Sequence, residues 1–242
     1  MKAIILAAGI GNRLKPVTDK MPKSLIKIGE KTILEQMIDS LASFGVNDIC
    51  FVVGHMRHMI TDLVGKKYKT AKFRYVFNPD YELGSVVSLW AAHEEFSGDD
   101  ALLMDADVIF EREVLAKLVD SKNPNCFLID KDFNDTGEEM KVAALNKRIV
   151  QIARKISREH DEAGEGVGFC RISSAYHGEL LKGLEKKICL NRACDYEMAL
   201  DDFIRRAPAG FEDITGLKWT EVDFPEDIKK AESLNLWEED RE

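Results

Sequence analysis

The chain has 242 residues, of which 45% are hydrophobic and 32% are charged. This composition is typical of a soluble globular protein, and the length allows a sizeable core without disulfides or metals as cross-links. The net charge of -9 at pH 7 argues against a nucleic-acid partner, which would require a basic face, although a local basic pocket for phosphates is compatible with it.

The five cysteines are odd in number and form no C-x-x-C pair, which predicts reduced thiols in a cytoplasmic protein and neither a disulfide framework nor a zinc site. The apolar start of the chain is too short for a signal peptide. In addition, Asn12, Arg13 and Lys15 follow it where a cleavage site would lie. No stretch approaches the length of a membrane span, so we expect no membrane association.

In residues 1–130, short apolar runs alternate with stretches of helical periodicity. This alternation predicts parallel strands joined by right-handed crossovers. We expect strands at residues 2–8, 49–53, 73–77, 101–104 and 126–129, and helices at residues 33–44, 56–64, 86–96 and 114–119.

After Lys131 the pattern changes, and Asn146-Lys147-Arg148 separates two short apolar runs as a hairpin would. Residues 161–168 are rich in glycine and acids and predict a loop. We expect strands at 142–145, 149–153, 167–172 and 217–222, and helices at 175–186, 196–206 and 226–237. The whole pattern predicts one domain over residues 1–242, with a Rossmann-like, three-layer α/β/α fold around a mostly parallel mixed sheet.

The most informative segment runs from Leu6 to Leu14 (LAAGIGNRL), directly after the first predicted strand. Glycines at this point let backbone N–H groups approach an anion closely, and Arg13 and Lys23 add two cations. In open α/β sheets, the carboxyl ends of the strands are where ligands bind. We therefore expect a phosphate-binding loop, and a valine at Gly11 should project into the path of the phosphates.

Three other interpretations of this loop agree less well with the sequence. A turn that merely needs glycine does not account for the neighbouring basic residues. A dinucleotide-binding fingerprint needs a third glycine, but Leu14 takes that place, and Pro16 and Pro22 exclude the long helix that should follow. A Walker P-loop sequence is absent.

Acidic residues follow two further predicted strands. Asp105 and Asp107 come after the strand at 101–104, and Asp223 comes after the strand at 217–222, so we expect them at the carboxyl edge of the sheet. Carboxylates together with substrate phosphates are the usual ligands of Mg²⁺. From their spacing alone, ligation of Mg²⁺ and a simple role as helix caps or solvated side chains are equally good interpretations of these acids.

The segment L-A-A-G-x-G-x-R-L-x-P-x-T, followed by Pro22-Lys23, resembles the signature of the nucleotidyltransferases that make nucleotide sugars and CDP-alcohols. The run from Val222 to Ile228 resembles the V-D-x-x-E-D-I segment of the same family. The resemblance implies a nucleotidyltransferase fold with residues 1–130 binding nucleotide, 131–216 binding the acceptor as a lid portion, and 217–242 closing the fold. It further implies nucleotide contacts from Leu6, Ala8, Gly9 and Gly11, catalytic contacts to phosphates from Arg13 and Lys23, and Mg²⁺ ligation by Asp107 and Asp223 with Asp105 in support.

Later segments resemble the phosphocholine cytidylyltransferase-like branch of this family. These are the N-x-x-Y…S-L segment at 78–89, Met140-Lys141-Val142, residues 152–156, Gly166-Val167-Gly168-Phe169 and Tyr196-Glu197. The resemblance implies base or ribose contacts from Asn78 and Ser85, and acceptor contacts from Lys155, Asp195 and Glu197. Each position also has a local alternative, because Asn78 and Ser85 suit a helix cap, Lys155 a solvated position, and the two acids a helix start.

The leading hypothesis is therefore a magnesium-dependent transfer of CMP from CTP to a small phosphorylated or phosphonylated acceptor, of the phosphocholine, 2-aminoethylphosphonate or inositol 1-phosphate type. A sugar-1-phosphate nucleotidyltransferase using UTP, dTTP or GTP is the alternative enzyme, and a catalytically silent nucleotide-binding subunit is the alternative outside enzymes. The joint presence of Arg13, Lys23, Asp107 and Asp223 argues against silence. No nucleic acid is expected as a partner, and a homodimer is left open.

Overall fold

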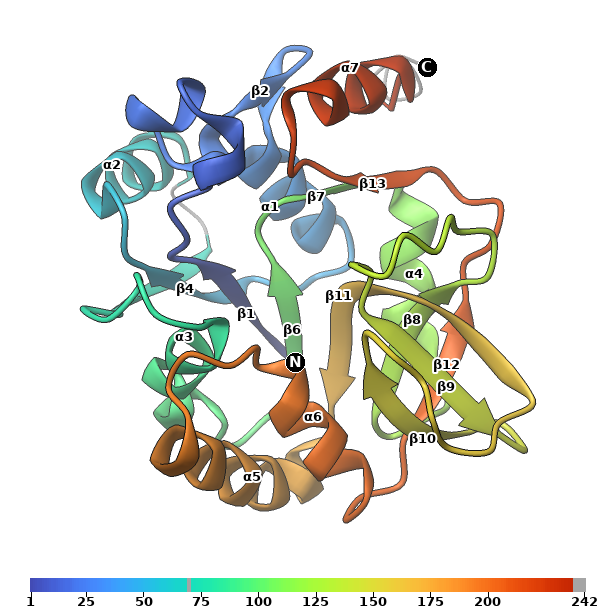
Figure 1. Cartoon of the computed structure of the whole chain (residues 1–242). Coiled ribbons are helices and arrows are strands. Elements are labelled where there is room, and N and C mark those ends of the chain that lie inside the picture. Colours follow the sequence, from blue (N-terminus) through green and yellow to red (C-terminus); the bar gives the residue numbers. More distant parts are fainter. Residues whose placement is uncertain (69–70, 237–242) are drawn as a thin grey trace.

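The computed structural model describes residues 1–68 and 71–236. A central sheet is covered by helices on both of its faces, which confirms the predicted three-layer α/β/α architecture (Figure 1). The main sheet has the strand order β10-β9-β11-β6-β1-β4-β5, and β8 pairs with both β11 and β12. Its strands are β1 (Lys2–Ala7), β4 (Asp48–Val53), β5 (Lys72–Phe77), β6 (Ala101–Asp105), β8 (Cys126–Asp130), β9 (Lys141–Leu145), β10 (Arg148–Ala153), β11 (Glu162–Ile172) and β12 (Gly210–Asp213).

The two halves of this sheet differ in strand direction. The strands β5, β4, β1 and β6 are parallel, so the carboxyl ends of β1 and β6 meet at one edge, where Leu6 lies opposite Asp105. The long strand β11 runs antiparallel to β6, β8 and β9. Because β11 joins the two halves, the sheet is continuous through the predicted nucleotide-binding and acceptor-binding portions.

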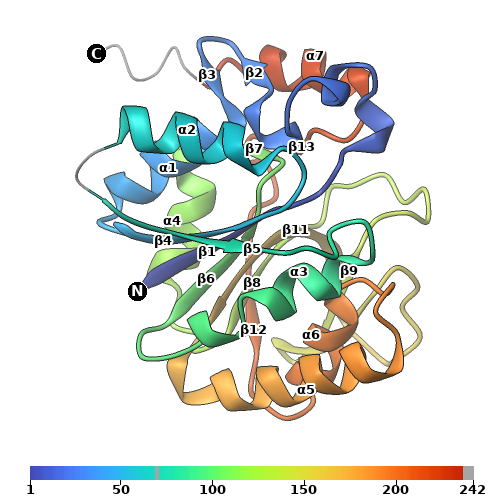
Figure 2. The same cartoon turned by 90° about the vertical axis from the view of Figure 1, so that its left-hand side faces the viewer.

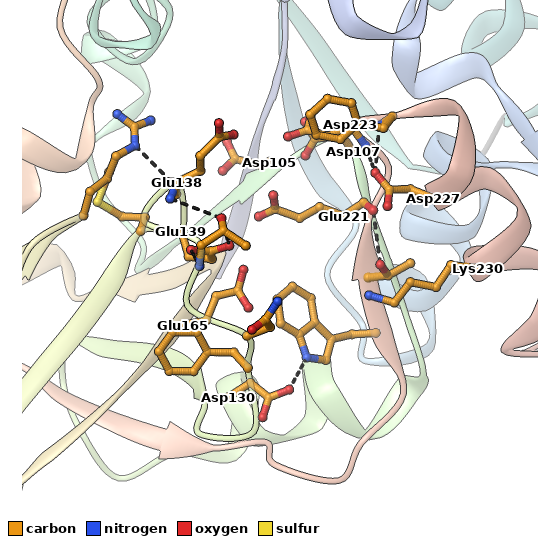
Figure 3. A pocket seen from close by; sticks show the side chains of 18 of the residues that line it. Asp105, Asp107, Asp130, Glu138, Glu139, Glu165, Glu221, Asp223, Asp227 and Lys230 are labelled. Atoms are coloured by element: carbon orange, nitrogen blue, oxygen red, sulfur yellow. Dashed lines mark hydrogen bonds between the residues drawn. The ribbon is translucent and has the colours of Figure 1, made fainter.

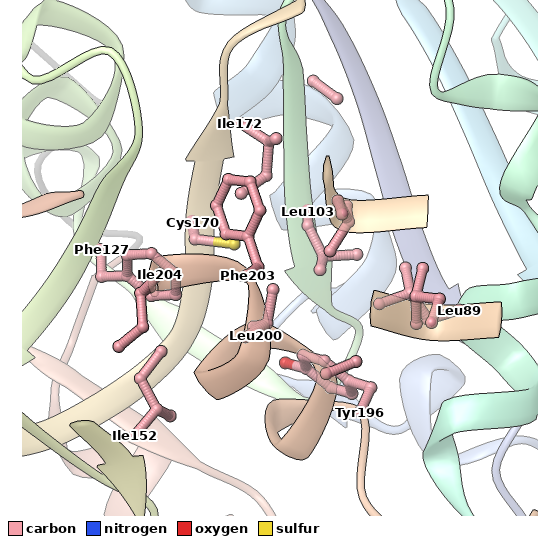
Figure 4. Close-up of a cluster of buried hydrophobic side chains, with 14 of the residues drawn as sticks. Leu89, Leu103, Phe127, Ile152, Cys170, Ile172, Tyr196, Leu200, Phe203 and Ile204 are labelled. Carbon is pink, nitrogen blue, oxygen red and sulfur yellow. The ribbon is translucent and has the colours of Figure 1, made fainter. Parts of the chain in front are cut away.

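Two cores lie on opposite faces of the sheet, and this explains the unbroken apolar run of β1. Ile4 belongs to the core under one set of helices, while Ala3 and Ile5 belong to the core under the other. Figure 4 shows part of the first core, between β6, β11 and α6, and Figure 2 shows α3, α5 and α6 together on this face. That face carries α3 (Ser85–Ala91), α5 (His177–Leu190) and α6 (Glu197–Ile204); the other carries α1 (Ile33–Ser43), α2 (Arg57–Lys67) and α4 (Arg112–Asp120).

A separate two-stranded ladder lies beyond the main sheet. It pairs β7 (Val108–Phe110) with β13 (Trp219–Glu221) in antiparallel register, and α7 (Pro225–Ser233) follows it. The sequence predicted the strand near β13 but placed it at the edge of the main sheet, which is corrected here. A short hairpin of β2 (Lys27–Ile28) and β3 (Lys31–Thr32) packs nearby.

The structure also corrects two element boundaries. Residues 161–168 are not a loop, because β11 already begins at Glu162; an added Cβ at Gly164 would lie 2.6 Å from the carbonyl oxygen of Asp130, so the glycine permits close strand pairing. The helix expected at 86–96 ends at Ala91 and is followed by a 3₁₀ turn, His93–Glu95. The expected end of the last helix at Trp237 lies outside the described residues. Within those residues, no helix is long and apolar enough to cross a bilayer.

Candidate functional site

The glycine-rich segment forms a tight loop between β1 and a 3₁₀ turn at Asn12–Leu14. Gly11 adopts a φ of 69°, and a Cβ there would lie 2.9 Å from the Cγ2 atom of Thr18, whose hydroxyl donates to the Gly11 carbonyl at 2.8 Å. Gly11 therefore closes the loop internally, which corrects the expectation that its substituent would enter the phosphate path. A Cβ at Gly9, by contrast, would meet open space.

This loop forms one wall of a cavity of about 420 Å³, which we call the loop cavity. The opposite wall is the segment that leads into α3, from Tyr81 to Ser88. Ser88 is the serine of the N-x-x-Y…S-L segment, but it was not among the residues expected to contact the nucleotide. The residues expected to contact a nucleotide that line this cavity are Leu6, Ala8, Gly9, Gly11, Arg13, Lys23 and Ser85.

Asn78 differs from that group. Only 2% of it is exposed, and its amide donates to the Ser88 hydroxyl at 2.9 Å while its oxygen accepts the backbone N–H of Asp80. It does not line the loop cavity, so the expected direct contact with a base or ribose is corrected to support of Ser88. The Ser85 hydroxyl accepts the backbone N–H of Tyr196 at 2.9 Å and thereby joins the start of α3 to the start of α6.

Two cations and two acids meet at the end of the loop cavity. The Lys23 ammonium donates to Asp107 at 2.7 Å and also contacts Asp223, and only 13% of the Lys23 side chain is exposed. Burial alone would lower the pKa of Lys23, but the two carboxylates raise it above its ordinary value, so the ammonium stays charged. Arg13 lies 3.2 Å from Asp223 and stacks over the Phe224 ring.

The β7–β13 ladder holds the two acids together. Asp107 immediately precedes β7, Asp223 follows β13, and the N–H of Val222 donates to the Asp107 carbonyl at 3.0 Å. The carboxylate of Asp227, in the first turn of α7, accepts the N–H groups of Asp223 and Phe224. The acidic run after Val222 thus caps a helix and fixes the backbone of Asp223 in the same contacts.

The donor set at this position fits Mg²⁺. Among the described residues, no three potential ligand side chains converge on one point, but Mg²⁺ is commonly held by one or two carboxylates and completed by phosphates and water. Asp107 and Asp223 supply such a pair, and both line the junction that the two cavities share.

A second cavity, of about 940 Å³, opens on the other side of the same acids, and many of its lining residues are acidic (Figure 3). We call it the acid-lined cavity. The two cavities share Arg13, Asp105, Asp107 and Asp223. Because both cavities reach these residues, the junction between them is where two ligands would meet.

Two carboxylates of this cavity, Glu165 and Glu221, have no hydrogen bond or ion pair to their side chains within residues 1–68 and 71–236, and Glu197 forms no ion pair there. The Oε2 atom of Glu197 is shielded from solvent and still lacks a partner. Burial raises the pKa of Glu197 and of Glu165 to about 7, and burial beside Asp107 and Asp223 raises that of Glu221 to about 8. Each of these groups therefore keeps a proton to a higher pH than an ordinary carboxyl group, and a cationic ligand would stabilise its charged form.

Glu221 could have been found in the sequence, because Trp219, Glu221 and Asp223 alternate along one strand and therefore face the same side. Glu165 could not, since its glycine-rich surroundings predicted a loop. Tyr196, from the Tyr196-Glu197 segment, is buried, and its hydroxyl donates to Asp105 at 2.8 Å. Tyr196 therefore links the start of α6 to the end of β6, two residues before Asp107.

Two of the residues expected to contact the acceptor lie outside both cavities. Lys155 is exposed beyond the end of β10 and lines neither cavity; its neighbour Arg154 lines the acid-lined cavity instead. Asp195 forms an ion pair with Arg154 at 2.8 Å and does not line the acid-lined cavity. Glu197 does line this cavity. The residue expected to contact the acceptor, Lys155, is thus the direct neighbour of Arg154, which lines the acid-lined cavity in the turn after β10.

Comparison with known proteins agrees with this geometry. Residues 3–164, more than half of the chain, match the family model for the MobA-like NTP transferase domain, and the chain therefore belongs to this family of nucleotidyltransferases.

Its relatives include cytidylyltransferases. CMP-5'-(3-aminopropyl)phosphonate synthase of Streptomyces rubellomurinus is 27% identical over 96% of this chain, which spans only 38% of that protein. CTP:phosphoglutamine cytidylyltransferase of Campylobacter jejuni is 22% identical, over 95% of this chain and 98% of its own length. The structure of CTP:phosphocholine cytidylyltransferase from Streptococcus pneumoniae superposes with a TM-score of 0.75 at 23% identity, covering 96% of this chain and 98% of that one, which shows the shared fold.

Proposed function

We propose that the protein is a cytidylyltransferase, which transfers CMP from CTP to a small phosphorylated or phosphonylated compound that bears a cationic group. The observation that carries this proposal is the junction of the two cavities, where Asp107 and Asp223 hold Lys23 between them. A nucleotide in the loop cavity and an acceptor in the acid-lined cavity would meet at these residues.

In the proposed reaction, an oxygen of the acceptor's phosphoryl or phosphonyl group forms a bond to the α-phosphorus of CTP. The bond from the α-phosphorus to the bridging oxygen of the β-phosphate breaks, and pyrophosphate leaves with that electron pair. The attacking oxygen is already anionic at neutral pH, so no general base is needed. The residues must instead align two anions and reduce their repulsion.

Arg13 and Lys23 serve that role. The guanidinium of Arg13 is half exposed beside the loop and contacts Asp223 and Glu138 by ion pairs that a phosphate group would replace. The ammonium of Lys23 is held at a fixed place by its two carboxylate contacts, next to the shared residues of both cavities. Backbone N–H groups around Gly9 add further donors without a side chain in the way.

Asp107 and Asp223 are the residues that would hold Mg²⁺. Bound there, the ion would supply positive charge to the phosphates of the nucleotide and to the leaving pyrophosphate.

Two observations support the substrates. The three similar proteins described above all carry CMP or CTP in their names, which favours a cytidine nucleotide. The unpaired carboxylates of Glu197 and Glu221 favour an acceptor with an ammonium group over a neutral sugar, because an ammonium compensates charge as well as donating hydrogen bonds.

The test is to measure pyrophosphate release with CTP, UTP, dTTP and GTP against phosphocholine, 2-aminoethylphosphonate, inositol 1-phosphate and glucose 1-phosphate. We expect turnover with CTP and an ammonium-bearing acceptor, loss of turnover in excess EDTA, and recovery on adding Mg²⁺.

Preference for glucose 1-phosphate with UTP would contradict the proposal and favour a sugar-1-phosphate nucleotidyltransferase. Nucleotide binding without pyrophosphate release for any acceptor would instead favour a catalytically silent subunit. Preference for inositol 1-phosphate with CTP would retain the cytidylyl transfer and refute the cationic acceptor.

A further inference from the structure

A third cavity, of about 50 Å³, adjoins the acid-lined cavity, and we call it the side pocket. The linings of these two cavities share Asp105, Met140, Glu197 and Glu221. The side pocket therefore branches off at the place where the acceptor would lie. The reaction proposed above leaves this space unused.

The walls of the side pocket are largely apolar. They include side chains from β8, β9, β10 and α6, each no more than 5% exposed, namely Phe127, Val142, Ile152 and Leu200. Figure 4 shows Phe127, Ile152 and Leu200 together in the core on this face of the sheet. Wall atoms beside an empty space lack packing partners, so an apolar group that entered the pocket would gain contacts as well as leave water.

The size of the side pocket limits what it can hold. A water-sized group needs roughly 10 to 15 Å³ of cavity volume. A volume of about 50 Å³ therefore accepts on the order of three or four carbon atoms. A short alkyl chain stays within this limit, whereas an aromatic ring exceeds it.

The mouth of the side pocket specifies the group to which such a chain is attached. The Oε2 atom of Glu197 is shielded from solvent and has no hydrogen-bond partner in the described part of the chain. A primary ammonium can donate an N–H group to this oxygen, whereas a quaternary ammonium has no N–H to donate. A ligand that carries a primary ammonium and an alkyl branch on one carbon atom would therefore contact both Glu197 and the apolar walls.

We propose that the acceptor carries a primary ammonium group, and that the carbon atom bearing it also bears an alkyl branch of up to about four carbon atoms that occupies the side pocket. This inference rests on the proposed cytidylyl transfer and specifies the shape of its acceptor. The phosphoryl or phosphonyl group lies at the junction with Asp107 and Asp223, the ammonium lies at Glu197, and the branch lies between β9, β10 and α6.

The experiment compares 2-aminoethylphosphonate with homologues that carry a methyl, ethyl, propyl or pentyl branch on the carbon atom bearing the ammonium, each as separate enantiomers. These are 2-aminopropyl-, 2-aminobutyl-, 2-aminopentyl- and 2-aminoheptylphosphonate. With CTP and Mg²⁺, we expect kcat/KM in one enantiomeric series to rise roughly 3- to 4-fold per carbon atom up to the propyl branch, as burial of a CH₂ group warrants. The pentyl branch exceeds the pocket and should lose this gain.

Variants test whether the gain arises in the side pocket. Val142→Leu adds one carbon atom to the wall and should lower the ratio of kcat/KM for the propyl compound to that for 2-aminoethylphosphonate roughly 3-fold or more. Leu200→Ala enlarges the pocket and should move the preference towards the pentyl branch. Val114→Leu, at a buried valine of α4 in the core on the other face of the sheet, is the matched control and should retain the ratio.

No gain from any branch in either enantiomer, or a gain that Val142→Leu does not reduce, would overturn the inference. Calorimetric binding of the same phosphonates separates this result from the proposed reaction. Affinity that rises with the branch and depends on Val142, without pyrophosphate release, would refute the cytidylyl transfer and leave the side pocket standing. Turnover of 2-aminoethylphosphonate with no gain from a branch would refute the side pocket and leave the transfer standing.

Discussion

At the loop cavity each cation has an acid beside it, since Lys23 contacts Asp107 and Asp223 and Arg13 contacts Asp223. Along the acid-lined cavity, Glu165, Glu197 and Glu221 form no such ion pair within residues 1–68 and 71–236. The first region holds its geometry without a ligand, whereas the second is electrostatically incomplete until a ligand binds. The comparison indicates that internal ion pairs preorganise the loop cavity. In the acid-lined cavity, acids without an ion pair would select the ligand by its charge.

The largest effect is expected at the paired acids. Asp107→Asn and Asp223→Asn each remove one carboxylate from the contact with Lys23 and from the proposed Mg²⁺ site, and kcat should fall on the order of 10²-fold or more. Pyrophosphate release at saturating CTP is the measurement. Asp62→Asn, on the exposed face of α2, is the control, and near-normal activity in both site variants would refute the catalytic role of this pair.

The next effect concerns the preorganised loop. Gly9→Val places a side chain in the open space of the loop cavity, and CTP affinity should weaken roughly 10-fold or more because the phosphates lose their approach to the backbone. Calorimetry of CTP binding measures this. Gly178→Val, at another glycine with open space but on α5, should leave CTP affinity unchanged; equal affinities in all three proteins would show that the loop does not hold phosphates.

At the incomplete end, Glu197→Gln should raise KM for a cationic acceptor on the order of 10-fold while KM for CTP changes little. The amide keeps the size of the side chain but removes the charge that the acceptor would neutralise. Glu185→Gln, exposed on α5, is the control. A parallel rise in both KM values would mean that the two cavities are not separate in the way described above.

The smallest effect concerns stability. Burial raises the pKa of Glu165 from 4.5 to about 7, so the folded state binds more protons than the unfolded state between these values. The free energy of unfolding attributable to this group therefore falls as pH rises from 4.5 to 7. Because the carboxylate is half exposed, solvent screening reduces the difference, and Glu165→Gln should be more stable by about 1 kcal/mol at pH 8 and equally stable at pH 4. Urea unfolding at the two pH values tests this, and a gain at pH 4 would contradict the cause given.

Much of the fold followed from the sequence for a definite physical reason. β1 is buried on both faces, so its apolar run is unbroken, and the glycines and basic residues of the following loop remain visible in the primary structure. Arg13, Lys23, Asp107 and Asp223 could be predicted because each lies in a short motif that follows a strand or the glycine-rich loop. The structure brings these four residues together.

The remainder depends on contacts between distant segments. Three-residue strands such as β7 carry no detectable periodicity, so their pairing with β13 could not be predicted. The turn after β10 places Arg154 in the lining of the acid-lined cavity and leaves the next residue, Lys155, outside it, and the sequence does not show which of the two neighbours takes which place. The glycines of β11 indicate a loop unless the strands that approach them closely are known.

The β7–β13 ladder has a consequence for how the protein is made. The chain leaves the ribosome from its amino terminus, so the loop, Lys23 and Asp107 emerge well before β13 and Asp223. A growing chain thus presents the phosphate loop with only one acid of the pair, and the backbone contact between Val222 and Asp107 cannot yet form. The acid pair is therefore completed only after β13 has emerged, and a chain that stops before this strand cannot carry out the reaction that we propose.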